Sequence, residues 1–189
     1  MIHFKKIRWK NFLSTGNAFT EVQLDRTKST LIIGDNGAGK STILDALTFV
    51  LFGKPFRAVN KSQLINSVNQ NGTEVEVEFS IGSKQYLVKR GIKKNFFEIY
   101  QDGKMLNQDA SVRDYQEYLE KTILKLNYKS FTQIVILGSS SFVPFMQLKA
   151  NDRRTIIEDL LDIEIFSVMN QLLKVRVAQN KEDMGTVDI

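Results

Sequence analysis

The sequence predicts an α/β fold that combines a strand–loop–helix unit, an antiparallel β meander and a long helix near the C-terminal end. The first unit is indicated by a strand expected at 29–33 with an apolar run at 31–33, a glycine-rich loop, and helical spacing of apolar residues from about Lys40 to Phe52. Three segments of alternating polarity then indicate the meander. Helical spacing from Asp152 to about Val177 indicates the long helix. The chain has 189 residues, 42% of them hydrophobic, which suits one good core rather than two.

The first third of the chain supplies the strand–loop–helix unit. Residues 1–9 and 18–24 have the pattern of short strands, and Leu31-Ile32-Ile33 is the continuous apolar run expected of a fully buried strand. Gly53 can close the helix that follows, and Pro55 prevents its continuation. We therefore expect three strands before this helix and a sharp turn after it.

The middle third supplies the meander. Strands are expected at 74–79, 85–90 and 96–100, and Asp102-Gly103 is typical of a tight turn after the third strand. A polar-faced helix is expected to follow from Ser111 to about Leu124.

The last third begins with another β-type run and continues as helix. The β-type run extends from Phe131 to Leu137, and apolar residues then recur at helical spacing. No internal repeat or flexible linker interrupts the pattern. We expect a main lobe over 1–150 and a helical exit segment over 151–189.

Composition narrows the class of protein. The net charge is +5 and the sequence pI is near 9.3, which suits a polyanionic partner such as DNA, although most basic proteins of this size are simply solvated. The absence of cysteine excludes disulfides, thiolate zinc sites and cysteine nucleophiles in this chain. It also suits a reducing compartment, so we expect a cytoplasmic location, or the host cytoplasm if the protein is phage-encoded. No stretch is long enough to span a bilayer, so we expect no membrane partner.

The glycine-rich loop matches the P-loop pattern G-x-x-x-x-G-K-[ST] without a mismatch. Its glycines let backbone N–H groups point at phosphate oxygens, and the positive end of the following helix adds to the attraction. Lys40 should reach the β- and γ-phosphates of ATP and stabilise charge in the transition state, Ser41 should ligate Mg²⁺, and Thr42 is placed for the α-phosphate. The predicted nucleotide-binding residues are Gly34, Asn36, Gly37, Ala38, Gly39, Lys40, Ser41 and Thr42.

The catalytic half of a P-loop hydrolase is missing from the sequence. Such enzymes need an apolar strand that ends in Asp, usually followed by a catalytic Glu. Leu44-Asp45 lies inside the predicted P-loop helix, and Ile156-Ile157-Glu158-Asp159 lies on a helical pattern, where a structural role is expected. Asn180-Lys181-Glu182-Asp183 matches the guanine-reading N-K-x-D, but no D-x-x-G occurs, so we interpret it as a charged helix end. The chain by itself should bind ATP without hydrolysing it.

The order of motifs resembles the N-terminal segment of the SbcC and Rad-fifty ATPases, SMC-like members of the ABC superfamily. The resemblance covers about residues 1–170 and is carried by Ile7–Phe12, Leu31–Ala46 and Leu51–Gly53. Other segments look closest to the large subunits of tailed-phage recombination endonucleases, namely Gly53–Arg57, Val135–Gly138 and Pro144–Met146. Arg153–Ile163 resembles the segment by which the family leaves the head for its coiled coil.

This resemblance implies a fold and a set of partners. The chain would be the N-terminal lobe of an ABC-ATPase head, ending in a long helix that begins a coiled coil, and Ile189 would be a point of truncation. The signature, the acidic strand and the switch histidine would come from the C-terminal half of the same ATPase head. Further implied partners are a second copy in an ATP-dependent head dimer, a nuclease subunit and DNA.

Three positions leave alternatives open. The family places an amide near the γ-phosphate at Asn36, which is otherwise a simple loop-forming residue. Many relatives carry Arg where this chain has Leu13. The Q-loop glutamine of the family falls on Ser139, which either binds magnesium through its hydroxyl or a water or only shapes a polar turn, while Gln133 is the nearest glutamine.

The role of each basic group outside the P-loop can be interpreted in two ways. Lys54, Arg57 and Lys61 follow the P-loop helix and either touch nucleotide or DNA or are solvated. A second basic group on the predicted hairpins either contacts the DNA backbone or is a solvated sheet edge. This group is Lys84, Lys89, Arg90, Lys93 and Lys94.

The sequence favours an ATPase head lobe that works in DNA double-strand-break repair or recombination by controlling DNA-end processing. Another P-loop class, such as a kinase or a transporter ATPase, is the alternative among enzymes. A non-hydrolysing ATP-dependent clamp or scaffold is the alternative outside them, because serine stands at the Q-loop position.

Overall fold

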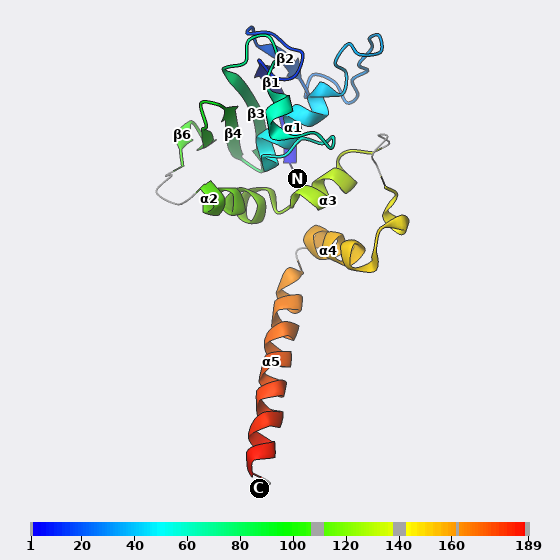
Figure 1. Cartoon of the computed structure of the whole chain (residues 1–189), viewed down its shortest axis with the longest axis vertical. Helices are drawn as coiled ribbons and strands as arrows, with labels where there is room; N and C mark the ends of the chain where they lie inside the picture. Colours follow the sequence, from blue (N-terminus) through cyan, green and yellow to red (C-terminus); the bar gives the residue numbers. More distant parts are fainter. Residues whose placement is uncertain (1, 107–111, 138–142, 162, 188–189) are drawn as a thin grey trace. The chain divides into compact units, whose positions relative to one another are not determined.

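The computed structural model describes residues 2–106, 112–137, 143–161 and 163–187. These residues form two compact units, Met1–Leu124 and Lys125–Ile189 (Figure 1). The structural boundary therefore lies before the position 150/151 expected from the sequence. The functional division into a head lobe and a helical exit segment stays a prediction.

The first unit contains one antiparallel sheet, for which the described residues supply six strands in the order β2-β1-β3-β4-β5-β6. Adjacent strands pair directly, and the only irregularity in the β1–β3 register lies between Phe4 and Lys6. The predicted meander is confirmed as β3, β4 and β5. The strands are β1 (Ile2–Lys10), β2 (Thr20–Gln23), β3 (Thr73–Ile81), β4 (Lys84–Ile92), β5 (Phe97–Gln101) and β6 (Lys104–Met105).

The two faces of the sheet differ in character because side chains alternate along each strand. One face is apolar and contacts helix α1 (Thr42–Phe52), which lies across β1, β3 and β4. The other face carries a ladder of ion pairs between β1 and β3: Lys6–Glu78 at 2.7 Å, Arg8–Glu76 at 2.6 Å and Lys10–Glu74 at 2.8 Å. The core on the helix side includes Ile7, Trp9, Phe49, Val50, Val75, Val77, Phe79, Val88 and Ile99.

Helix α1 ends as the sequence predicts. Gly53 adopts φ 70°, a left-handed conformation that glycine enters without steric cost, and its N–H donates to Phe49 O at 2.8 Å. The polar-faced helix is also confirmed, as α2 (Val112–Tyr118) followed by a π-helical turn (Leu119–Leu124). The buried Tyr115 hydroxyl joins α2 to the sheet, because it accepts from Ile99 N at 3.1 Å.

The predicted strand at 29–33 is wrong for this chain. These residues have no strand pairing, and Leu31 and Ile33 are 82% and 83% exposed. A buried strand needs a neighbouring strand and an apolar cover, and the described residues offer the run neither. Leu31–Ile33 is therefore an exposed hydrophobic segment that leads into the P-loop.

The predicted β-type run at 131–137 is also wrong. The structure has helix α3 (Tyr128–Ile134) there, and Asn127 caps it by accepting from Ser130 N at 2.9 Å. This cap satisfies a helical N–H and outweighs the strand preference of the sequence that follows. Gln133 therefore lies on a helix rather than in a strand, and Ser139 lies outside the described residues.

The single long helix expected from Asp152 onward is two helices, α4 (Ala150–Leu161) and α5 (Glu164–Val187). Asp159 on α4 accepts hydrogen bonds from the side chains of Asn127 and Ser130, so it fastens α4 to the start of α3. This confirms the structural role expected for the Glu158-Asp159 pair. Searched over the described residues, the helices include none that is long and apolar enough to cross a membrane.

Candidate functional site

The P-loop turns sharply between β2 and α1, and two of its glycines make the turn possible. Gly37 and Gly39 have φ 86° and 90°, where residues with a Cβ are strained. A Cβ on Gly34 would come within 3.3 Å of the Ala38 Cβ, which is tighter than ordinary contact. The glycine spacing of the motif is therefore required by this backbone.

Helix α1 begins with donors that suit an anion. Ser41 is the N-cap residue, and its side chain makes no capping hydrogen bond, so its hydroxyl is not committed to the helix. Lys40 Nζ donates to the carbonyl oxygens of Gly34 and Asp35, both at 2.7 Å, which holds the ammonium over the loop. A lysine ammonium, loop N–H groups and a helix N-terminus are the donor set that binds phosphate, and a free serine hydroxyl is a ligand that Mg²⁺ accepts. The residues present therefore fit a magnesium nucleotide.

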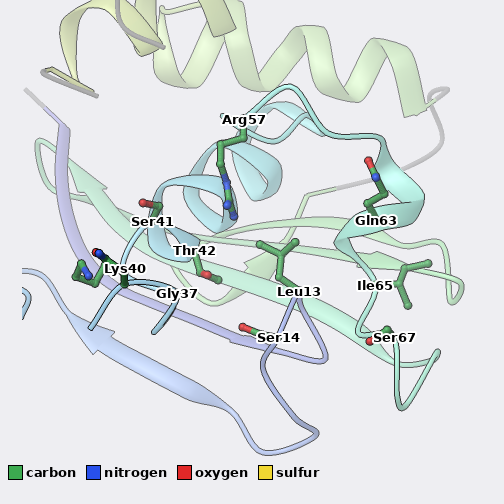
Figure 2. A pocket seen from close by; sticks show the side chains of 12 residues that line it. Leu13, Ser14, Gly37, Lys40, Ser41, Thr42, Arg57, Gln63, Ile65 and Ser67 are labelled. Atoms are coloured by element: carbon green, nitrogen blue, oxygen red, sulfur yellow. The ribbon is translucent and has the colours of Figure 1, made fainter. Parts of the chain in front are cut away.

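A pocket of about 580 Å³ opens beside the loop (Figure 2). Figure 2 shows the P-loop residues gathered on one side and Gln63, Ile65 and Ser67 on the other, with Leu13 between them. This volume lies within the usual range for small-molecule sites, roughly 300–1,000 Å³. The lining residues are Leu13, Ser14, Asn36, Gly37, Gly39, Lys40, Ser41, Thr42, Arg57, Gln63, Ile65 and Ser67.

The structure brings most of the predicted site residues together. Six of the eight P-loop residues line the pocket, while Gly34 and Ala38 instead shape the turn, with Ala38 N donating to Asp35 O at 3.2 Å. Thr42 is buried and its N–H already donates to Gly39 O at 2.9 Å, which leaves its hydroxyl for the role expected at the α-phosphate. The role of each residue toward nucleotide stays a prediction.

One cation from outside the P-loop also lines the pocket. Arg57 donates its backbone N–H and its Nε to the two carboxylate oxygens of Asp45, at 3.0 Å and 2.7 Å. Asp45 lies on α1 and is fully buried, whereas the Arg57 side chain is 46% exposed. A buried carboxylate thus anchors a partly exposed guanidinium at the pocket. This position favours a contact between Arg57 and nucleotide over a solvated surface role.

The second basic group predicted from the hairpins does not form a single surface. Arg90 is buried beneath α1, where its Nε donates to Val50 O at 3.1 Å and its guanidinium lies 3.7 Å from the Phe97 ring centroid. Burial lowers the pKa of Arg90 to about 9, so the group is still charged at neutral pH. Lys89 points to the opposite face and pairs with Glu76 at 3.4 Å. Arg90 is therefore a buried structural residue and not part of a solvated sheet edge, and the two alternatives stay open for the other members of the group.

The residues that sequence reasoning missed lie on the far side of the pocket. Gln63, Ile65 and Ser67 follow no spacing rule that ties them to a P-loop. The only signal nearby is the turn-forming run Asn69-Gln70-Asn71-Gly72, which indicates a loop but no ligand. Among the described residues no group of three or more His, Cys, Asp or Glu is placed to hold a metal ion.

Comparisons with known proteins agree with this geometry. Exonuclease subunit 2 of Escherichia phage RB69 is 45% identical over 174 residues, which are 92% of this chain and 31% of that protein. The DNA double-strand break repair Rad50 ATPase of Thermoplasma acidophilum is 31% identical over 175 residues, 89% of this chain and 19% of that protein. The Smc head domain from Pyrococcus furiosus superposes with a TM-score of 0.65 at 23% identity, over 100% of this chain and 49% of that chain, which shows a shared fold.

The antiparallel sheet, the P-loop before α1 and the helices that follow share the fold of SMC ATPase head domains, and agree with the N-terminal lobe expected from the sequence. The profile of the AAA domain family matches residues 6–184. The chain therefore belongs to the AAA domain family, and over most of its length it is similar to the phage exonuclease subunit and to the Rad50 ATPase. It spans less than a third, 31%, of the length of its phage relative.

Proposed function

We propose that this chain is the ATP-binding part of an ATPase of DNA double-strand-break repair or recombination. ATP and Mg²⁺ would bind at Lys40 and Ser41, and a second copy of the head would close the site. A nuclease subunit and DNA would be the further partners, since similar proteins are named as an exonuclease subunit and as a DNA double-strand break repair ATPase. The observation that carries the proposal is the P-loop cradle, with its ammonium, N-terminal helix end and uncommitted Ser41 hydroxyl in one pocket.

The same proposal has the chain bind nucleotide without turning it over. No acidic side chain is among the residues that line the pocket, and Asp45, the carboxylate on α1, is occupied by Arg57. P-loop hydrolysis requires a carboxylate to hold magnesium and a group to orient water. These would come from the C-terminal half of the head.

Calorimetric titration with MgATP and a phosphate-release assay test both parts. We expect saturable binding that requires magnesium, with no phosphate release above buffer, and loss of binding in Lys40→Ala. Ser41→Ala should weaken the magnesium dependence. Turnover that scales with protein concentration and disappears in Lys40→Ala would show that the chain holds its own catalytic carboxylate.

A further inference from the structure

Two backbone segments make the wall of the pocket that faces the P-loop (Figure 2). Leu13 and Ser14 belong to the turn after β1, and Ile65 and Ser67 follow a short 3-10 helix, Lys61–Leu64. The segments run side by side, because Leu13 N donates to Leu64 O at 2.7 Å. We call these four pocket-lining residues the far wall.

The buried side chain of Asn66 fastens the two segments to each other. Its Nδ2 donates to the carbonyl oxygens of Leu13, at 3.1 Å, and Thr15, at 3.0 Å. Its Oδ1 accepts from the N–H groups of Val68 and Asn69, both at 2.9 Å. An asparagine amide has two donor hydrogens and two acceptor lone pairs, so every hydrogen bond that Asn66 can make is used in this way.

A second buried asparagine, Asn11, extends this network. It has φ 49°, and its Oδ1 accepts from Asn69 Nδ2 at 2.6 Å while its Nδ2 donates to Asn17 Oδ1 at 2.9 Å. Its carbonyl oxygen accepts from Asn66 N at 3.0 Å. Asn11, Asn17, Asn66 and Asn69 therefore form one connected group, which we call the asparagine clamp.

The chemistry of the far wall differs from that of the P-loop side. The P-loop side offers an ammonium and backbone N–H groups, which suit phosphate. The far wall offers the aliphatic surfaces of Leu13 and Ile65 and the hydroxyls of Ser14 and Ser67, with no charged group. Apolar surface with a few hydroxyls suits the base and ribose of a nucleotide.

We propose that the asparagine clamp positions the far wall for the nucleoside part of the nucleotide, with Asn66 as the central positioning residue. This rests on the proposed function, because it assumes that the phosphates bind at the P-loop. A wall that is held in place before the ligand arrives loses less conformational freedom on binding, so the clamp strengthens nucleotide affinity without touching the ligand. Aspartate cannot replace Asn66, since it lacks both donors.

The test compares two ligands, the magnesium complexes of a non-hydrolysable ATP analogue and of tripolyphosphate, by calorimetry on the full chain. Tripolyphosphate needs only the P-loop, whereas the ATP analogue needs both sides of the pocket. Asn66→Leu removes the clamp bonds at nearly constant volume and without adding charge. We expect it to weaken the ATP analogue about tenfold or more and tripolyphosphate by less than about twofold.

Milder and matched variants make the test decisive even if Asn66→Leu does not fold. Asn69→Ala removes one exposed arm of the clamp and should weaken only the ATP analogue, about threefold. Asn71→Ala is the control, since its side chain accepts only from the adjacent Gly72 N, at 2.7 Å, and lies outside the clamp. It should bind both ligands as the unmodified chain does.

The outcomes separate the inference from the proposed function. The inference is overturned if Asn69→Ala binds the ATP analogue as tightly as the unmodified chain does, or if the clamp variants lose affinity equally for both ligands. The proposed function survives either result as long as tripolyphosphate binding still requires Lys40. If Lys40→Ala retains both ligands, the proposed function itself fails.

Discussion

Asp45 and Arg57 show how a single buried charge can serve a binding site. Desolvating a carboxylate is costly unless a cation and hydrogen bonds compensate, and here one residue supplies both through its N–H and its guanidinium. The exposed remainder of that guanidinium is then held at the pocket. The buried carboxylate therefore fixes the direction of a cation that would otherwise move freely on its long side chain.

This pair gives a prediction about stability. Asp45→Ala and Arg57→Ala should each destabilise the chain by about 2–4 kcal/mol, and the double variant should lose less than the sum, because the two residues stabilise one contact. Urea denaturation measures the three values.

The control for that prediction is an exposed pair. Lys121 and Glu117 lie 2.7 Å apart with side chains 64% and 54% exposed, so Lys121→Ala should cost about 0.5 kcal/mol or less. Additive losses in the Asp45–Arg57 double variant would contradict the coupling.

At the residue scale, the sequence identified one side of the pocket and missed the other. The P-loop side lies within nine consecutive residues, Gly34–Thr42, whose spacing is dictated by phosphate geometry. The Asp45–Arg57 contact and the Asn66 bonds to Leu13 and Thr15 join residues that are distant in the chain. The spacing of apolar and polar residues in the sequence cannot predict such contacts, because they depend on how loops fold back onto the sheet.

At the scale of secondary structure, the elements that the sequence predicted correctly carry their own local signals. Polar and apolar residues alternate along β3 of the meander, and α1 has Gly53 at its end. The elements predicted wrongly depend on their surroundings. Leu31–Ile33 is apolar enough for a buried strand but has no strand beside it, and the run after Asn127 follows its N-cap into a helix despite its β-type composition.

The link between β4 and α1 leads to a second prediction. Arg90 on β4 donates to Val50 O near the end of α1 and, through Nη2, to Gln116 Oε1 on α2 at 2.6 Å, so it joins three elements. Arg90→Met should lower the free energy of unfolding by about 2–4 kcal/mol, because it leaves buried acceptors without a donor. Thermal unfolding of the chain measures the loss.

The exposed Lys84 at the start of the same strand provides the comparison. Lys84→Met should change stability by about 0.5 kcal/mol or less. If Arg90→Met and Lys84→Met change the free energy of unfolding equally, the buried hydrogen bonds of Arg90 make no net contribution to stability.

For the whole molecule, two of the segments that expose apolar side chains lie far apart in sequence. One is the run Leu31–Ile33 before the P-loop, and the other is α5, where Phe166, Leu172 and Leu173 are each more than half exposed. Contiguous exposed apolar surface in a folded protein usually marks a contact with another segment or chain.

The corresponding prediction separates association from folding. Replacing Leu31 and Ile33 together with lysine should leave the free energy of unfolding within about 0.5 kcal/mol, because neither side chain is buried. The same change should reduce self-association, measured by light scattering.

Leu51→Ala is the matched control for that pair, since Leu51 on α1 is fully buried. It should destabilise the chain by about 2–5 kcal/mol. If the lysine pair proves as destabilising as Leu51→Ala, the run at 31–33 is packed in solution.

The ladder on the outer face of the sheet has an electrostatic consequence. Lys6, Arg8 and Lys10 on β1 stand opposite Glu78, Glu76 and Glu74 on β3, so positive and negative charges alternate over a few ångströms. Because the three pairs carry no net charge, their potential falls off faster with distance than that of a net charge, and salt shortens its reach further. The ladder by itself therefore exerts little long-range attraction on an approaching polyanion. The net positive charge of the chain therefore resides in residues outside the ladder, and long-range attraction of a polyanion would have to come from them.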